Sequence, residues 1–252
     1  MRVVRVGTSN DYAGVVPQEQ RGWHIASQML SEAAGEPVET ILKRAWPTAE
    51  LASHIVRWLD EYDPDLVLLQ VSNFWYGHES APLWFERRLG RPGKYLADTG
   101  LRLGKKPWLA DNRLGVAASR ALVRVLPSAT HFTVAQVVEA MESAIQRVVA
   151  REGPVLVVRG HDHWEKLPMS SRRANNRNIA RNRAMSAAMR DLCARYRVPY
   201  AERPPVSRAE MRTMLAAAQF HNSVEGERIS GEVDGRMMVA AWTAGRPTPR
   251  PR

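Results

Sequence analysis

Residues 3–11 read VVRVGTSND, and this stretch decides how the rest of the chain is interpreted. A mainly apolar run, residues 3–6, ends at Gly7 and is followed at once by polar residues. Short apolar runs that stop at a turn residue are typical of buried strands. The stretch therefore predicts a first strand that delivers Ser9 to the edge of a sheet.

Further apolar runs follow, separated by longer segments with helical periodicity. They cover residues 38–42, 66–71, 155–159 and 198–201. Strands that alternate with helices predict βαβ units and a parallel sheet. Continuous apolarity indicates strands that are buried on both faces. We expect a three-layer α/β/α protein with a mostly parallel, five-stranded sheet.

The intervening segments carry helix signals. The predicted helices include residues 51–59, 134–149 and 175–196, where the first two show apolar side chains at i, i+3, i+4 spacing. Thr48 and Thr133 stand where N-caps are expected, and Gly35 follows a helix end. These capping residues therefore support the helices that the apolar periodicity predicts.

Length and composition favour one globular domain. The chain has 252 residues, 44% of them hydrophobic, which is enough for one large core. We expect a domain over residues 1–242, an insertion at about residues 75–130, and a disordered basic tail over residues 243–252. No apolar stretch resembles a signal peptide or a membrane helix, so we expect a cytoplasmic protein. The single cysteine, Cys193, is expected to be buried in a helix.

Polar residues collect where the predicted strands end. Ser9 follows the first run, Ser72 and Asn73 follow the third, and His161 follows the fourth. Parallel strands end at one edge of a sheet, so these residues become neighbours. His221 precedes a last predicted helix, and a serine and a histidine can therefore meet.

This order of motifs resembles the SGNH, or GDSL-like, hydrolases. Gly7-Thr8-Ser9 corresponds to the family's Gly-Asp-Ser, residues 65–73 to its strand leading into Gly-x-Asn, and His221 with Gly226 to its closing His and Gly. The resemblance spans nearly the whole chain and implies a flavodoxin-like fold and ester hydrolysis without a metal or cofactor.

The resemblance also implies roles for individual residues. Ser9 would attack the ester carbonyl, and His221 would accept its proton. The backbone N–H of Ser9, the amide of Asn73 and a backbone N–H near Ala45 would hold the oxyanion. Other expected pocket residues are Thr8, Asn10 and His161.

The chain departs from the family pattern at several positions. Ala218 stands where the family has the aspartate that orients the histidine, and Asp162 or Glu225 is a substitute from another position. Thr8 replaces aspartate in the first motif, and Val71 replaces the glycine before Ser72. The alternative to an esterase is therefore a catalytically weakened protein that binds an acylated or anionic ligand.

Other patterns have two interpretations each. Residues 161–163, His-Asp-His, have metal-ligand spacing, but they lack an evident third ligand, so we favour pocket-lining roles. One face of a predicted helix carries three regularly spaced arginines, Arg173, Arg177 and Arg181. This pattern suits either binding of nucleic acid or a basic face exposed to solvent. We favour the solvent-exposed face, although the net charge of the chain is +10. The aromatic residues of the insertion suit either stacking on a substrate or packing. We expect a small-molecule ester as partner, with nucleic acid and membrane disfavoured and the oligomeric state open.

Overall fold

The structure is a computed structural model of the whole chain. It describes residues 1–7, 9–12, 16–95, 99, 128–161, 172–202, 210, 213–215 and 221–245. The predicted insertion is described only in part, and the predicted tail is described only at residues 243–245.

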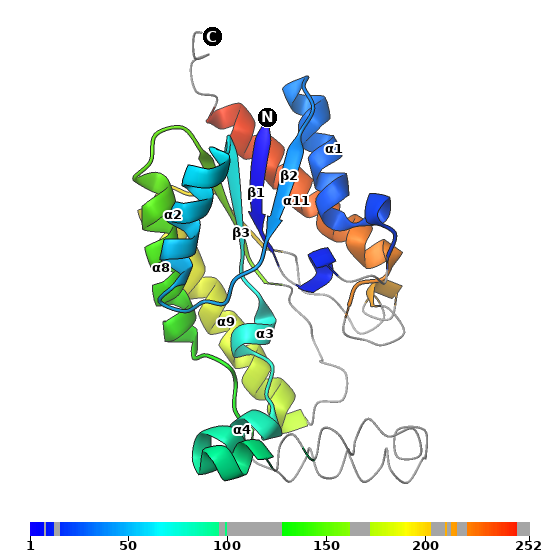
Figure 1. The fold of residues 1–252 in the computed structure, drawn as a ribbon. Coiled ribbons are helices and arrows are strands. Elements are labelled where there is room, and N and C mark those ends of the chain that lie inside the picture. The colour runs from blue at the N-terminus through cyan, green and yellow to red at the C-terminus, as the bar shows by residue number, and fades with distance from the viewer. Residues whose placement is uncertain are drawn as a thin grey trace.

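Five parallel strands form the sheet at the centre of the protein (Figure 1). They are β1 (Arg2–Val6), β2 (Glu39–Lys43), β3 (Leu66–Gln70), β4 (Val155–Arg159) and β5 (Tyr200–Ala201), in the spatial order β2-β1-β3-β4-β5. This order is the flavodoxin-like one, in which ligands bind at the carboxyl ends of the strands. The three-layer α/β/α prediction is confirmed.

Helices cover both faces of the sheet (Figure 1). On one face lie α1 (Gly22–Ala34) and α11 (Val224–Ala244), and on the other lie α2 (Leu51–Tyr62), α8 (Val134–Val149) and α9 (Arg172–Arg195). The short helices η1 (Ser9–Tyr12), η2 (Gln18–Gln20), α3 (Asn73–Tyr76) and α4 (Ala81–Leu89) lie in the connections. Residues Leu66–Leu69 of β3 are at most 1% exposed, which confirms burial on both faces for this strand. The same prediction is wrong for β2 and β5, whose residues are only partly buried or exposed because these strands lie at the edges of the sheet.

Strand side chains alternate between two apolar cores. Val4 and Val67 face the core under α2, α8 and α9. Val3, Leu68 and Val157 face the core under α1 and α11. Apolar strands thus fit a sheet that is enclosed on both sides.

Two of the predicted N-caps have different outcomes. Thr133 caps α8 in a capping box with Gln136, as predicted. The prediction for α2 is wrong, because Glu50 and not Thr48 occupies the N-cap position. Thr48 instead accepts a hydrogen bond from the backbone N–H of Leu51 through its carbonyl oxygen, at 3.0 Å, so a turn precedes the helix.

The C-terminal helix packs tightly on α1. A Cβ atom at Gly231 would lie 2.6 Å from the carbonyl oxygen of Gly22, so only glycine permits this approach. Helix α11 ends at Ala244, slightly beyond the predicted start of the tail. In the part of the chain that the structure describes, no helix is both long and apolar enough to cross a bilayer.

Candidate functional site

A pocket of about 140 Å³ lies at the carboxyl ends of β1, β2 and β3. It is lined by Gly7, Ser9, Arg44, Ala45, Trp46, Ser72, Phe74 and Trp75, and we call it the strand-end pocket. Each of the three strands is followed by residues of this set. The convergence is a consequence of parallel topology, which brings together residues far apart in sequence.

Ser9 begins the short helix η1 and is exposed at the pocket. The loop that carries it is fixed from below by Asp11, whose carboxylate accepts a 3.0 Å hydrogen bond from Nε of Arg5. Gly7 makes room for this carboxylate, because a Cβ there would lie 1.5 Å from Oδ2 of Asp11. The glycine of the first motif therefore allows the serine loop to fold back over the strand.

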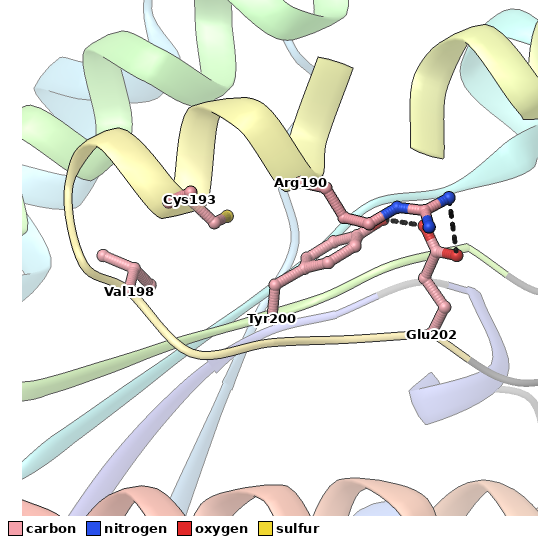
Figure 2. A pocket seen from close by; sticks show the side chains of 6 residues that line it. Arg190, Cys193, Val198, Tyr200 and Glu202 are labelled. Carbon is pink, nitrogen blue, oxygen red and sulfur yellow. Dashed lines mark hydrogen bonds and ion pairs between the residues drawn. The ribbon is translucent and has the colours of Figure 1, made fainter. Parts of the chain in front are cut away.

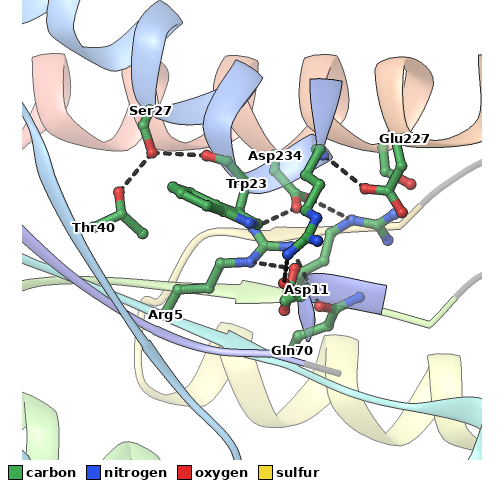
Figure 3. Close-up of polar contacts among 12 residues, drawn as sticks. Arg5, Asp11, Trp23, Ser27, Thr40, Gln70, Glu227 and Asp234 are labelled. Carbon is green, nitrogen blue, oxygen red and sulfur yellow. Dashed lines mark hydrogen bonds and ion pairs between the residues drawn. The ribbon is translucent and has the colours of Figure 1, made fainter. Parts of the chain in front are cut away.

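Arg5 belongs to a buried charged network that sequence reasoning missed (Figure 3). Its Nη1 donates to Asp234 of α11 at 2.7 Å, and Nε of Arg159 donates to the other oxygen of Asp234, also at 2.7 Å. Burial opposes the charge on Arg5, but Asp11 and Asp234 outweigh it and raise its pKa. We call Arg5, Asp11, Asp234 and Arg159 the buried charge network.

A signal for this network exists in the sequence. Arg5, Gln70 and Arg159 each stand two residues after an apolar residue that faces α1 and α11, so they continue the same face of the sheet. Side chains at i and i+2 of a strand share a face. The positions of these three polar residues therefore indicate that they lie together on one face of the sheet. They do not indicate that Asp11 and Asp234 are the acidic partners.

The first turn of α11 is tied to the same region. The buried carboxylate of Glu227 accepts a 2.7 Å hydrogen bond from the backbone N–H of Gly22. Burial raises the pKa of Glu227, and the nearby charge of Asp11 acts in the same direction. Glu227 and Asp11 therefore lie within electrostatic reach of each other, next to the loop of Ser9.

His221 lies in the turn just before α11, whose N-terminus is at the same edge of the sheet as η1 (Figure 1). Asn222 pairs with Leu215 in a bridge, and Ser223 caps α11, so the turn is anchored on its C-terminal side. Within the described part of the chain, no hydrogen bond joins Ser9 to His221. The expected pairing of the two remains a prediction.

Asn73 is placed differently from its neighbours. Ser72 and Phe74 line the strand-end pocket, whereas the amide of Asn73 donates to Asn182 and, at 3.3 Å, to Asn178 of α9. Both amide hydrogens are thus directed at α9. The sequence placed Asn73 at the correct strand end but gave no sign of these partners.

The other predicted site residues have mixed outcomes. Ala45 lines the pocket, and His161 is buried edge-on against Tyr76. Glu225 accepts hydrogen bonds from Arg228 on the surface, and its role in orienting His221 remains a prediction. Asn10 is part of η1, but its side chain is not described. Four of the residues named in the sequence analysis lie outside the described residues: Thr8, Asp162, His163 and Ala218. Among the residues that the structure describes, no group of three or more His, Cys, Asp or Glu side chains could hold a metal ion.

An aromatic group forms the rim of the pocket. The ring of Phe74 lies 6.1 Å from that of Trp46 and 5.0 Å from that of His131, and Trp46 and His131 are 5.1 Å apart. His78 stacks on Phe74 with an interplanar angle of 19°. We call Trp46, Phe74, His78 and His131 the aromatic wall.

The arginine-rich face of α9 has an internal partner. Glu79 accepts hydrogen bonds from Arg177 at 2.7 Å and Arg181 at 2.8 Å, and also from Ser128. Burial would raise the pKa of Glu79, but these bonds outweigh it and lower the pKa to about 2. Arg177 and Arg181 therefore fasten the segment after α3 to α9.

A second hollow, of about 320 Å³, lies beside β5 (Figure 2). Tyr200 donates to Glu202, and Arg190 pairs with Glu202 at 3.8 Å. Burial raises the pKa of the Cys193 thiol to about 12, so the thiolate needed for chemistry is suppressed. The predicted burial of Cys193 is confirmed, and the suppressed thiolate makes this cysteine a poor nucleophile.

Sequence comparison gives no relative, since no family model and no curated protein matches the chain. Solved structures do match. The crystal structure of TesA has a TM-score of 0.55 at 12% identity, covering 94% of this chain and 98% of that one. A carbohydrate acetylesterase, Est24 from Sinorhizobium meliloti, has a TM-score of 0.53 at 10% identity, covering 95% and 99%.

A third match is the native aryl esterase of M. smegmatis, with a TM-score of 0.52 at 10% identity, covering 95% of this chain and 99% of that one. Identities this low establish the fold alone. The matches span nearly the full length of both partners in each case. The chain therefore shares the three-layer α/β/α fold of these three proteins.

Proposed function

We propose that the protein is a serine hydrolase that cleaves a short-chain O-acyl ester of a small molecule. The observation that carries the proposal is the strand-end pocket, in which exposed Ser9 meets residues from the ends of β2 and β3. The fold is shared with an acetylesterase and an aryl esterase, which supports ester chemistry at this edge.

The proposed reaction proceeds by acyl transfer. Oγ of Ser9 attacks the ester carbonyl carbon while His221 accepts the serine proton, and His221 then returns that proton to the departing alcohol oxygen. A water molecule next attacks the acyl-serine while one of its protons passes to His221, and His221 then gives this proton to Oγ of Ser9 as the bond between the acyl carbon and Oγ breaks and the carboxylic acid leaves. His221 in the turn before α11 must reach Ser9 for either half of the reaction.

The oxyanion requires donors beside the attacked carbonyl. The backbone N–H of Ser9 and one near Ala45 are the proposed donors, because both residues line the pocket. Asn73 contributes in this proposal only if its amide exchanges the longer, 3.3 Å contact with Asn178 for the substrate. Loss of a single donor of this kind costs about 10² to 10³ in kcat.

The size of the pocket limits the acyl group. Pockets for drug-sized ligands are about 300 to 1,000 Å³, whereas this one is about 140 Å³. The pocket is therefore large enough for a short acyl chain but not for a whole substrate of drug-like size. Activity on p-nitrophenyl esters should therefore fall as the chain grows from acetyl to octanoyl.

A fluorophosphonate probe tests the proposal directly. We expect the wild-type protein to be labelled at Ser9, and Ser9→Ala to lose both labelling and turnover of p-nitrophenyl acetate. Ser53→Ala, at an exposed position of α2, is the matched control and should behave as wild type. Absence of Ser9-dependent labelling between pH 6 and 9 would reject the hydrolase.

The second candidate is a binding protein of the same fold. It is favoured by the amide of Asn73, which is held by α9 rather than turned to the pocket. In that case Asn73→Ala would leave ligand affinity at the pocket unchanged, and no ester would be turned over. A hydrolase that uses Asn73 would instead lose most of its kcat in the same variant.

A further inference from the structure

The strand-end pocket contains a cation that the proposed reaction does not use. Among the lining residues that the structure describes, Arg44 is the only one with a charged side chain. It is exposed, and within the described part of the chain no carboxylate pairs with it. A guanidinium presents paired donors that match a carboxylate or phosphate.

The aromatic wall stands beside this cation. Trp46 is 39% and Phe74 is 47% exposed, although large aromatic side chains usually bury more of their surface. Both also line the pocket that contains Ser9. Two exposed rings held by His131 and His78 provide a preformed surface for a flat ligand.

We infer that the pocket selects a short-chain ester whose alcohol portion carries a flat ring and a negative charge. The ring lies against Trp46 and Phe74, the charge faces Arg44, and the acyl group occupies the pocket beside Ser9. This assignment rests on the proposed function, because attack by Ser9 fixes where the ester bond lies.

The electrostatics of the wall are consistent with this division of roles. Burial lowers the pKa of both His78 and His131, and His78 is lowered further by the charge of His131. At neutral pH the wall is therefore uncharged and stacks without desolvating a cation. The attraction for an anion comes from Arg44, and the net charge of +10 adds a weaker long-range contribution.

The charge preference is tested with a matched pair of substrates, the anion 4-acetoxybenzoate and its neutral isostere 4-acetoxybenzamide. Their kcat/KM values are compared after each is divided by the rate constant for alkaline hydrolysis of the same ester. We expect wild type to favour the anion by about tenfold, as one hydrogen-bonded charge contact allows. In Arg44→Gln the ratio should fall to about one.

Arg57→Gln is the matched control for this experiment. Arg57 is an exposed arginine of α2 outside the pocket, so its loss changes the net charge equally and should leave the ratio at about the wild-type value. A ratio near one in wild type, or an equal fall in both variants, overturns the role of Arg44.

The ring preference has its own comparison. The specificity constant for the aromatic ester 4-acetoxybenzoate, normalised in the same way, is divided by that for 4-acetoxybutanoate, an anionic ester without a ring. Trp46→Leu should lower this ratio about fivefold, the size of one aromatic contact. An unchanged ratio rejects stacking on the wall.

Binding separates this inference from the proposed function. Calorimetry with 4-acetoxybenzoate is carried out on Ser9→Ala and on the double variant Ser9→Ala/Arg44→Gln. Weaker binding by the double variant supports the anion site even if wild type hydrolyses no ester. Equal binding, together with Ser9-dependent hydrolysis that ignores charge, overturns the inference and leaves the hydrolase standing.

Discussion

The two faces of the sheet differ in how they are filled. The face under α2, α8 and α9 is an apolar core, whereas the face under α1 and α11 combines a smaller apolar core with the buried charge network. The network lies directly beneath the loop of Ser9 and reaches α11, the helix that His221 precedes. We therefore expect the first face to contribute mainly to stability, apart from the α9 contacts that hold Asn73, and the second face to position the loop of Ser9.

The largest expected effect comes from breaking the network at its centre. Asp234→Ala leaves two buried arginines without a shared carboxylate, and breaking a buried pair costs about 3–5 kcal/mol. Urea denaturation should show this loss. Glu232→Ala, which removes a surface carboxylate from the same helix, should cost about 0–1 kcal/mol. Similar losses in both variants would contradict the special role of the network.

The apolar face is tested by a cavity. Ile145 is fully buried there, and Ile145→Ala should lower the free energy of unfolding by about 2–5 kcal/mol. The kcat of the folded protein should remain within about twofold, because a local cavity leaves the pocket groups in place. A large fall in kcat would show that this face also positions the site.

The ion pairs of Glu79 with Arg177 and Arg181 of α9 should make stability depend on acid pH. The pKa of Glu79 is lowered to about 2, so its contribution to stability is present above the unfolded value of 4.5 and is lost as the pH falls from about 4.5 to 2. Glu79→Gln should flatten the stability profile in that window by about 2 kcal/mol. Identical acid unfolding curves for the two proteins would refute the contribution.

The smallest expected effect concerns position rather than stability. Asp11→Asn keeps the shape of the side chain but weakens its contact with Arg5, which retains Asp234. We expect kcat with p-nitrophenyl acetate to fall about tenfold with KM nearly constant, because misplacing a reactive group lowers the rate of the bound complex. A change confined to KM would show that Asp11 does not position Ser9.

Local sequence determined much of the architecture. The run at residues 155–159 coincides with β4, and the capping box at Thr133 starts α8, because these signals act within a few residues. The ends of β1, β2 and β3 were marked closely enough to predict that Ser9 and Ala45 would meet at one edge. Parallel topology requires that meeting once the strands are assigned.

Only the tertiary structure decided which polar groups are paired. Asp234 lies 229 residues from Arg5, and Asn73 finds its amide partners on α9, so no local pattern reveals either contact. Trp46, Phe74 and His131 likewise converge from three separate segments. Hydrophobic periodicity reports whether a side chain is buried, whereas the identity of its partner depends on how distant elements pack.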